Sequence, residues 1–223
     1  MVVEGPSAAG KTTWCRRHAP HLVGEYMPDG NEPGPSDPVT QASFWTDVNC
    51  RRWQTAVGME RIHQTVICDT DPVKLHYSWT LARIGRGDPA RFAAELQSTR
   101  AAIEQGRLGM ADVHLVRIPP PSVLDQQKRS DPTRRRHSFP VHRLLSEPLR
   151  EWYSALAHLD PARVVWQHPD NGLTELPELT VRPDRNNPTL LDALLDALPP
   201  SAHPMRLRTH GRKPPNLPRR HAR

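Results

Sequence analysis

The stretch Gly5-Pro6-Ser7-Ala8-Ala9-Gly10-Lys11-Thr12 decides how the rest of this chain is interpreted. Its spacing of glycines, lysine and threonine, G-x-x-x-x-G-K-T, is typical of a loop that cradles phosphate oxygens. Such a loop needs a strand before it and a helix after it, so that backbone N–H groups converge on one anion. The apolar Met1-Val2-Val3 precedes the stretch, and residues 13–17 suit a helix. The flanks therefore favour a phosphate site over the alternative, a glycine-containing turn with a chance lysine.

The residue types within this stretch predict how it would hold a nucleotide. Gly5 and Gly10 permit backbone conformations and a close approach that a Cβ would obstruct. Lys11 is long enough to reach the β- and γ-phosphates, and the Thr12 hydroxyl is suited to ligate Mg²⁺. We therefore expect residues 5–13, Thr13 included, to bind ATP with Mg²⁺, and Lys11 to act in catalysis as well.

Length and charge predict one folded domain and a separate basic tail. The 223 residues suit a single α/β domain, which we assign to residues 1–198. The net charge is +6, but seven Lys and Arg and no acid fall in residues 199–223, so the remainder carries about −1. This Pro-rich tail has no core-forming pattern and is expected to be disordered. Because the positive charge belongs to the tail, no nucleic-acid surface is expected on the domain.

The cysteines and the short apolar runs predict a cytoplasmic protein. Cys15, Cys50 and Cys68 are odd in number and show no C-x-x-C spacing, which argues against a disulfide framework or a zinc site. No stretch approaches ~20 consecutive apolar residues, so no membrane-spanning helix is expected. The glycine-rich loop begins almost at once, which leaves no room for a signal peptide.

Strand-like and helix-like segments alternate along the chain. The expected strands are residues 1–4, 21–26, 65–69, 113–118 and 163–167. The expected helices are residues 11–19, 39–63, 89–105, 122–128, 141–159 and 188–198, and residues 71–84 are expected to form a helix or a turn. This order predicts an α/β fold with a central parallel sheet and helices on both of its faces.

Acidic residues follow the clearest predicted strand. Asp69 ends the apolar run 65–68, and ligands of parallel sheets bind outside the C-terminal ends of the strands. A carboxylate there is able to hold Mg²⁺ or to accept a proton from an attacking hydroxyl, and the alternative is a cap for the next helix. For Asp71, which Pro72 follows, an N-cap is at least as good an interpretation as catalysis.

Glu25 ends the predicted second strand and should face the same crevice. It is a candidate general base for an acceptor hydroxyl, with a solvated strand-end glutamate as the equal alternative. Tyr26, Trp45 and Trp53 are candidates to wall an acceptor pocket by stacking. At helical spacing, however, aromatic residues more often belong to the core.

A basic segment before the last long helix is a candidate lid. Residues 126–143 contain six Lys and Arg and one acid, Asp131. We expect the segment to close over a triphosphate and to bring guanidinium groups to the charge that develops in phosphoryl transfer. Arg129 and Arg134 are the residues chosen for this catalytic role, and the alternative is a solvated charged loop.

Together these parts resemble the P-loop kinases of the nucleoside and nucleotide kinase group, which includes thymidylate kinases and deoxynucleoside kinases. The resemblance covers roughly residues 1–198 and is carried by Glu4 with the loop 5–12, by Glu25, by Asp69 and by the arginine-rich segment 129–136. It implies a three-layer P-loop NTPase fold, with Lys11 and Thr12 holding phosphate and Mg²⁺. It also implies that Glu25 or Asp69 is the base and that lid arginines cover the phosphates.

Two positions depart from the pattern of that group. Thr70 stands where an arginine commonly follows the acid of the third strand, and Tyr26 stands where a proline commonly follows the glutamate of the second. The triphosphate site is untouched by these departures. They leave the acceptor open, including a hydroxyl on an antibiotic or another metabolite.

The favoured function is transfer of the γ-phosphoryl group from ATP to a small-molecule acceptor, with a nucleoside or nucleotide as the first choice. Two alternatives use the same loop. One is an ATPase or nucleotide-dependent switch without a small-molecule acceptor, and the other is a kinase of nucleic-acid ends whose basic tail holds the polymer. The favoured interpretation expects no membrane or nucleic-acid partner and leaves a homodimer open.

Overall fold

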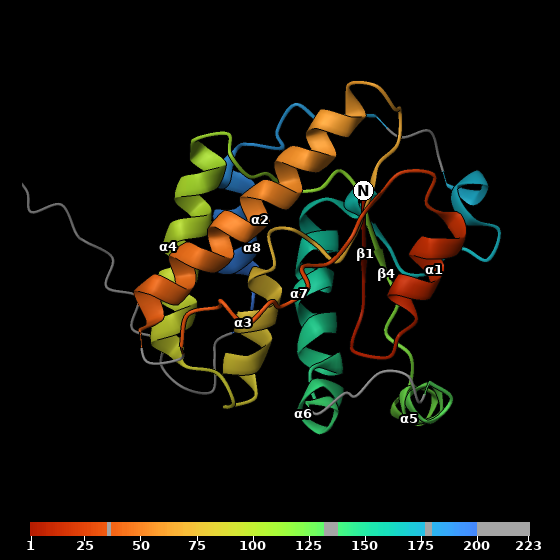
Figure 1. Ribbon diagram of the computed structural model, residues 1–223, viewed down its shortest axis with the longest axis horizontal. Helices are drawn as coiled ribbons and strands as arrows, with labels where there is room; N and C mark the ends of the chain where they lie inside the picture. The colour runs from red at the N-terminus through yellow and green to blue at the C-terminus, as the bar shows by residue number, and fades with distance from the viewer. Residues whose placement is uncertain (35–36, 132–137, 177–179, 200–223) are drawn as a thin grey trace, which may run out of the picture.

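A five-stranded parallel sheet forms the centre of the protein, as the sequence predicts (Figure 1). The computed structural model describes residues 1–34, 37–131, 138–176 and 180–199. The strands are β1 Val2–Glu4, β2 Leu22–Val23, β3 Ile67–Asp69, β4 His114–Val116 and β5 Val164–Val165, in the order β2-β3-β1-β4-β5. The predicted lid residue Arg134 and residues 200–223 of the predicted tail lie outside the described ranges.

The register brings the C-terminal ends of the central strands to one edge. Val3 in β1 lies opposite Asp69 in β3 and opposite Leu115 in β4. Because parallel strands share a direction, the segments that leave β1, β3 and β4 emerge side by side. The loop 5–12 is one of these segments.

The helices follow the predicted order, with two differences. Their bounds are α1 Lys11–His18, α2 Pro38–Glu60, α3 Leu75–Arg83, α4 Pro89–Glu104, α5 Pro121–Arg129, α6 Phe139–Arg143, α7 Ser146–Leu159 and α8 Pro188–Ala197. Short 3₁₀ turns η1 and η2 cover Pro161–Arg163 and Gly172–Glu175.

The predicted helix 141–159 is wrong, because the segment is divided between α6 and α7. A continuous helix would place Pro148 in its interior, where proline has no N–H to donate. Within residues 71–84 the helix begins only at Leu75, because Lys74 before it adopts a left-handed conformation with φ 49°. Asp71 therefore does not cap that helix.

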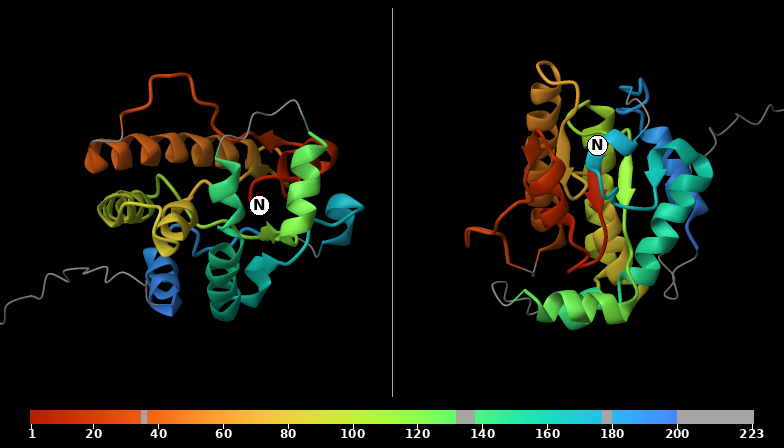
Figure 2. Two further views of the ribbon diagram at one scale, coloured as in Figure 1. Left: turned by 90° about the horizontal axis from the view of Figure 1, so that it is seen from below. Right: turned by 90° about the vertical axis from the view of Figure 1, so that its right-hand side faces the viewer.

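Helices cover both faces of the sheet, and in Figure 1 the strands β1 and β4 lie between α7 and α1. On one face Trp14 and Cys15 of α1 pack with Val3, Ile67 and Leu115. On the other face Val2 and Cys68 pack against Ala56 of α2, and the largest apolar cluster joins Val116 to α2, α3, α4, α7 and α8. Figure 2 shows α2, α4 and α8 stacked in that order. Val2 and Val3 thus point to opposite faces of the sheet, as neighbouring residues of a strand do, and both are apolar because the sheet is buried on both sides.

Ion pairs lie at the opposite edge of the sheet, where β5 begins. Arg163, fully buried before β5, donates to Asp160 at 3.0 Å, to Asp184 at 2.5 Å and to the Ala111 carbonyl at 2.9 Å. Arg185 likewise contacts Asp112 and lies 2.7 Å from Glu60. These contacts fasten the segment before α8 to the sheet, away from the loop 5–12.

None of the helices in the described part of the chain is long and apolar enough to cross a membrane. Cys15, Cys50 and Cys68 are all buried and free.

Candidate functional site

The loop 5–12 leaves β1 and runs directly into the N-terminus of α1. Gly10 is the N-cap of that helix and has a left-handed φ of 88°. A Cβ built on Gly5 would lie 2.3 Å from the Arg117 carbonyl oxygen, so only glycine fits there. Lys11 turns back over the loop, and its Nζ donates to the Gly5 carbonyl at 2.7 Å. The arrangement aims a helix N-terminus and an ammonium group at one concave surface, which suits an anion.

Asp69 ends β3 beside this loop, as the sequence predicts. Its side chain is 3% exposed, and Oδ1 has no hydrogen-bond partner among the described residues. Burial raises the pKa of Asp69 above its usual value, while the Thr12 side chain and the charge of Lys11 act in the opposite direction. A carboxylate oxygen with no partner beside a threonine hydroxyl is the kind of donor set that Mg²⁺ prefers. Asp69 and Thr12 therefore fit the predicted metal site.

Asp71 has a structural position in the turn that follows β3. Its carboxylate accepts the Val73 N–H at 2.9 Å and lies 3.3 Å from Nε2 of His114. Burial raises the pKa of Asp71, but His114, His76 and the Val73 N–H together outweigh burial and leave the pKa below its usual value. The side chain thus stabilises the turn from inside, which is neither of the two roles considered from the sequence.

Glu25 lies beyond the second strand rather than in it. The prediction of a strand to residue 26 is wrong, because only Leu22 and Val23 pair with β3 and the edge strand ends there. Glu25 accepts a salt bridge from Lys74 at 2.6 Å. Burial raises the pKa of Glu25, but the charge and hydrogen bond of Lys74, together with the charges of Lys11 and Arg52, outweigh burial and leave the pKa below its usual value.

A large cavity of about 980 Å³ opens between the loop 5–12, α2, α3 and α4. Lys11, Thr12 and Glu25 all line it, whereas Asp69 is not among its lining residues. Its polar and aromatic walls also include Tyr26, Trp45, Asn49, Arg52, Tyr77, Arg91, Glu95 and His142. Trp53 is instead part of the apolar core, which is the alternative that its helical spacing favours.

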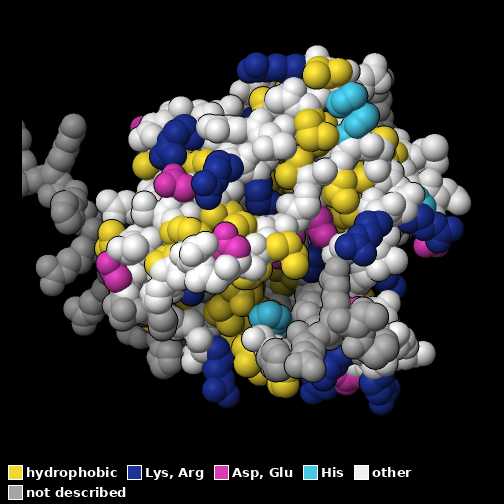
Figure 3. Space-filling view, in the orientation of Figure 1, with side chains coloured by type: hydrophobic (Ala, Val, Ile, Leu, Met, Phe, Trp, Pro, Cys, Tyr) yellow, Lys and Arg dark blue, Asp and Glu magenta, His cyan; other side chains and the backbone are white. Residues whose placement is uncertain are grey.

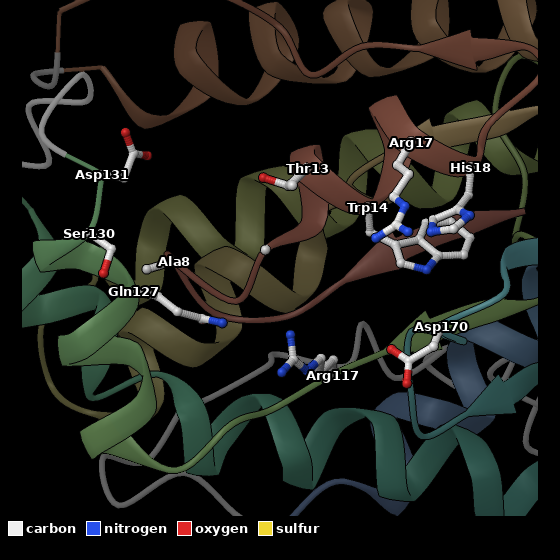
Figure 4. A pocket seen from close by; sticks show the side chains of 11 residues that line it. Ala8, Thr13, Trp14, Arg17, His18, Arg117, Gln127, Ser130, Asp131 and Asp170 are labelled. Carbon is white, nitrogen blue, oxygen red and sulfur yellow. The ribbon is translucent and has the colours of Figure 1, made fainter.

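A smaller cavity of about 360 Å³ borders the same loop (Figure 4). Ala8, Gly10, Thr13 and Asp131 border both cavities. The other residues that line the smaller cavity are Trp14, Arg17, His18, Arg117, Gln127, Ser130 and Asp170. In Figure 4 the side chains of Gln127 and Asp170 point into this space from opposite sides.

Arg117, Gln127 and Asp170 were not among the site residues expected from the sequence. Arg117 directly follows β4, so its position at a strand end was the available signal. Its Nη1 donates to the Ala9 carbonyl at 3.2 Å, which holds the guanidinium against the loop.

The described part of the predicted lid contributes fewer cations than expected. Arg129 is the last residue of α5, is exposed and lines neither cavity. Arg143 pairs with Asp125 at 2.8 Å, and the Lys128 ammonium lies 4.8 Å from the centre of the Phe139 ring. Gln127, Ser130, Asp131 and His142 are the lid residues that line cavities.

No model of a known protein family matches the chain, and a search of curated proteins found no match. The functional interpretation therefore depends on the geometry of the loop and its two cavities.

Proposed function

We propose that this protein is an ATP-dependent kinase of the P-loop type that transfers the γ-phosphoryl group to a small acceptor, a nucleoside or nucleotide. One observation carries the proposal. Residues of the loop 5–12 line two cavities, and Ala8 and Gly10 line both of them. A triphosphate on this loop would extend from a nucleoside in the smaller cavity to an acceptor in the larger one. Phosphoryl transfer requires that donor and acceptor meet in line at the γ-phosphate, and the proposal assigns one cavity to each of them.

On this proposal the chain holds the triphosphate through the loop amides, Lys11 and Thr12. Lys11 now contacts the Gly5 carbonyl and would exchange that contact for phosphate oxygens. Thr12 and Asp69 would hold Mg²⁺, whose charge neutralises the charge that develops on the phosphoryl oxygens. The position of Asp69 outside the larger cavity favours this role over that of base.

Glu25 is then the better candidate for the general base. It lines the larger cavity, and its lowered pKa keeps it ionised at neutral pH. Lys74, at 2.6 Å, holds the carboxylate in place. A base must be deprotonated and within reach of the acceptor hydroxyl, and Glu25 meets the first condition.

The larger cavity also distinguishes this proposal from the two alternatives. A switch or ATPase needs no space for an acceptor, yet the larger cavity has room for a drug-sized molecule. On the face in Figure 3, Lys and Arg side chains are dispersed among acids rather than gathered in one patch. The described side chains on that face therefore offer a nucleic-acid polymer no continuous basic surface.

The test is transfer of labelled γ-phosphate from ATP to a panel of nucleosides, nucleotides and other hydroxyl compounds. We expect a labelled product with at least one acceptor and a loss of about 100-fold or more in Lys11→Ala. Lys213→Ala, in the basic tail of the sequence, is the matched control and should keep its rate. Label released only to water would instead support the ATPase alternative. Substantial transfer by Lys11→Ala would reject the role of the loop.

A further inference from the structure

Arg52 reaches from α2 into the edge of the sheet where the candidate site lies. Its Nε donates to the Gly24 carbonyl at 3.0 Å, and its Nη2 donates to the carbonyls of Asp69 at 2.6 Å and Thr70 at 3.0 Å. The residue is 8% exposed and lines the larger cavity. One guanidinium group thus joins the segment after β2 to the turn after β3.

The turn held by Arg52 has a strained backbone. Thr70 has a left-handed φ of 69°, which is unfavourable for a β-branched residue. On its other side, the Asp71 N–H donates to Oε1 of Glu4 at 2.7 Å. The turn is therefore held by two side chains. Arg52 donates to the carbonyls of Asp69 and Thr70, and Glu4 accepts the N–H of Asp71. Such over-determination is what allows a strained conformation to persist.

Within the described part of the chain, Arg52 forms no ion pair with a carboxylate, and its three hydrogen bonds named above all go to carbonyl oxygens. A buried cation without an ion pair is a costly way to fasten two loops. Its planar fork, however, is able to bond carbonyls of both loops at once, which a lysine ammonium does less well. The joined carbonyls belong to Asp69 and to the residue immediately before Glu25.

We propose that Arg52 is a positioning residue, which fixes the Asp69 carboxylate at the metal side of the site and ties it to the segment that carries Glu25. This inference rests on the proposed function, because it assigns Asp69 to Mg²⁺. Arg52 acts through the backbone and contacts neither phosphate nor metal. Replacing a residue that contacts a metal ligand, but not the metal itself, commonly changes metal affinity by about 10- to 100-fold.

The experiment measures ADP binding by calorimetry, once with excess MgCl₂ and once with EDTA. The readout is the ratio of the two dissociation constants, which reports the contribution of Mg²⁺ alone. We expect Arg52→Met to bind ADP in EDTA as tightly as the wild type does. With Mg²⁺, its gain in ADP affinity should be about tenfold smaller than in the wild type, or absent if the wild-type gain is itself below tenfold. Arg52→Lys should fall between the two. Arg51→Met, an exposed neighbour on the same helix, is the matched control and should behave as the wild type.

The outcomes are distinct. An equal loss of affinity with and without Mg²⁺ would show a general structural role and overturn the inference, as would an unchanged ratio. If Arg52→Met does not fold, Arg52→Lys decides on the same readout. Wild-type protein that binds no ADP under either condition would overturn the proposed function as well, whereas normal wild-type binding with an unchanged ratio in the variants overturns only the role of Arg52.

Discussion

The carboxylate of Glu4 accepts the backbone N–H of Asp71 at 2.7 Å, across 67 positions of sequence. Its other oxygen accepts the Gly5 N–H at 3.1 Å, and Nε2 of His76 lies 3.4 Å from Oε1. With only 2% of its surface exposed, Glu4 joins the start of the loop 5–12 to the turn after β3. A single buried carboxylate therefore sets the distance between the two segments that would hold phosphate and metal.

Replacing Glu4 should destabilise the protein markedly. Glu4→Ala leaves the N–H groups of Gly5 and Asp71 buried without acceptors, and we expect a loss of roughly 2–4 kcal/mol in the free energy of unfolding. Glu4→Gln keeps one acceptor oxygen and should lose about half as much. Urea unfolding measures the difference, and Glu104→Ala, at an exposed site on α4, is the control. Equal stability of Glu4→Ala and the control would contradict the structural role of Glu4.

Asp69→Asn should raise thermal stability, although it removes a carboxylate that we propose as a metal ligand. The pKa of Asp69 is raised in the folded protein, chiefly by burial, so the ionised carboxylate opposes folding at neutral pH. The sign follows: stability from this group is present at low pH and is lost as pH rises through its folded pKa. The gain in Tm of Asp69→Asn should therefore be largest near pH 7 and shrink in acid. Calorimetric scans across pH measure it, and a variant that is less stable at every pH would contradict this account.

Gly5→Ala should damage the loop because its new Cβ would lie 2.3 Å from the Arg117 carbonyl oxygen. We expect a loss of roughly 1–3 kcal/mol in stability from the forced shift, together with loss of ADP affinity. Gly58→Ala is the contrasting control, since nothing lies within 4 Å of a Cβ there and the residue is helical. That control should gain up to about 1 kcal/mol in urea unfolding. Unimpaired nucleotide binding by Gly5→Ala would argue against the close approach.

Arg163→Met tests the ion pairs at the opposite edge of the sheet. The buried guanidinium contacts Asp160, Asp184 and the Ala111 carbonyl, and its loss leaves these acceptors unpaired. Breaking a buried pair by removing one partner costs roughly 3–5 kcal/mol, and we expect a loss at the lower end because Asp184 is 43% exposed. The midpoint of urea unfolding should fall, while the ratio of ADP affinities with and without Mg²⁺ stays unchanged. A change in that ratio would mean that the two edges are coupled.

Several parts of the fold are predictable from the sequence because they depend on local pattern. The apolar run before Asp69 forms β3, and Pro89 after Asp88 begins α4 with an aspartate cap. The predictions failed where neighbours along the chain are a poor guide. The edge strand β2 ends at Val23 because pairing with β3, and not residue type, decides its length.

The candidate site divides in the same way. By itself the sequence determined the glycine-rich loop, its place between a strand and a helix, and the acid at the end of β3, because each depends on residues that are adjacent in the chain. Only the tertiary structure brought Arg52 to the Asp69 and Thr70 carbonyls, Glu4 to Asp71, and Arg117 to the loop. These contacts join residues that lie tens of positions apart in the sequence. They form because the strand ends are buried together at one edge of the sheet, and no local sequence pattern encodes that arrangement.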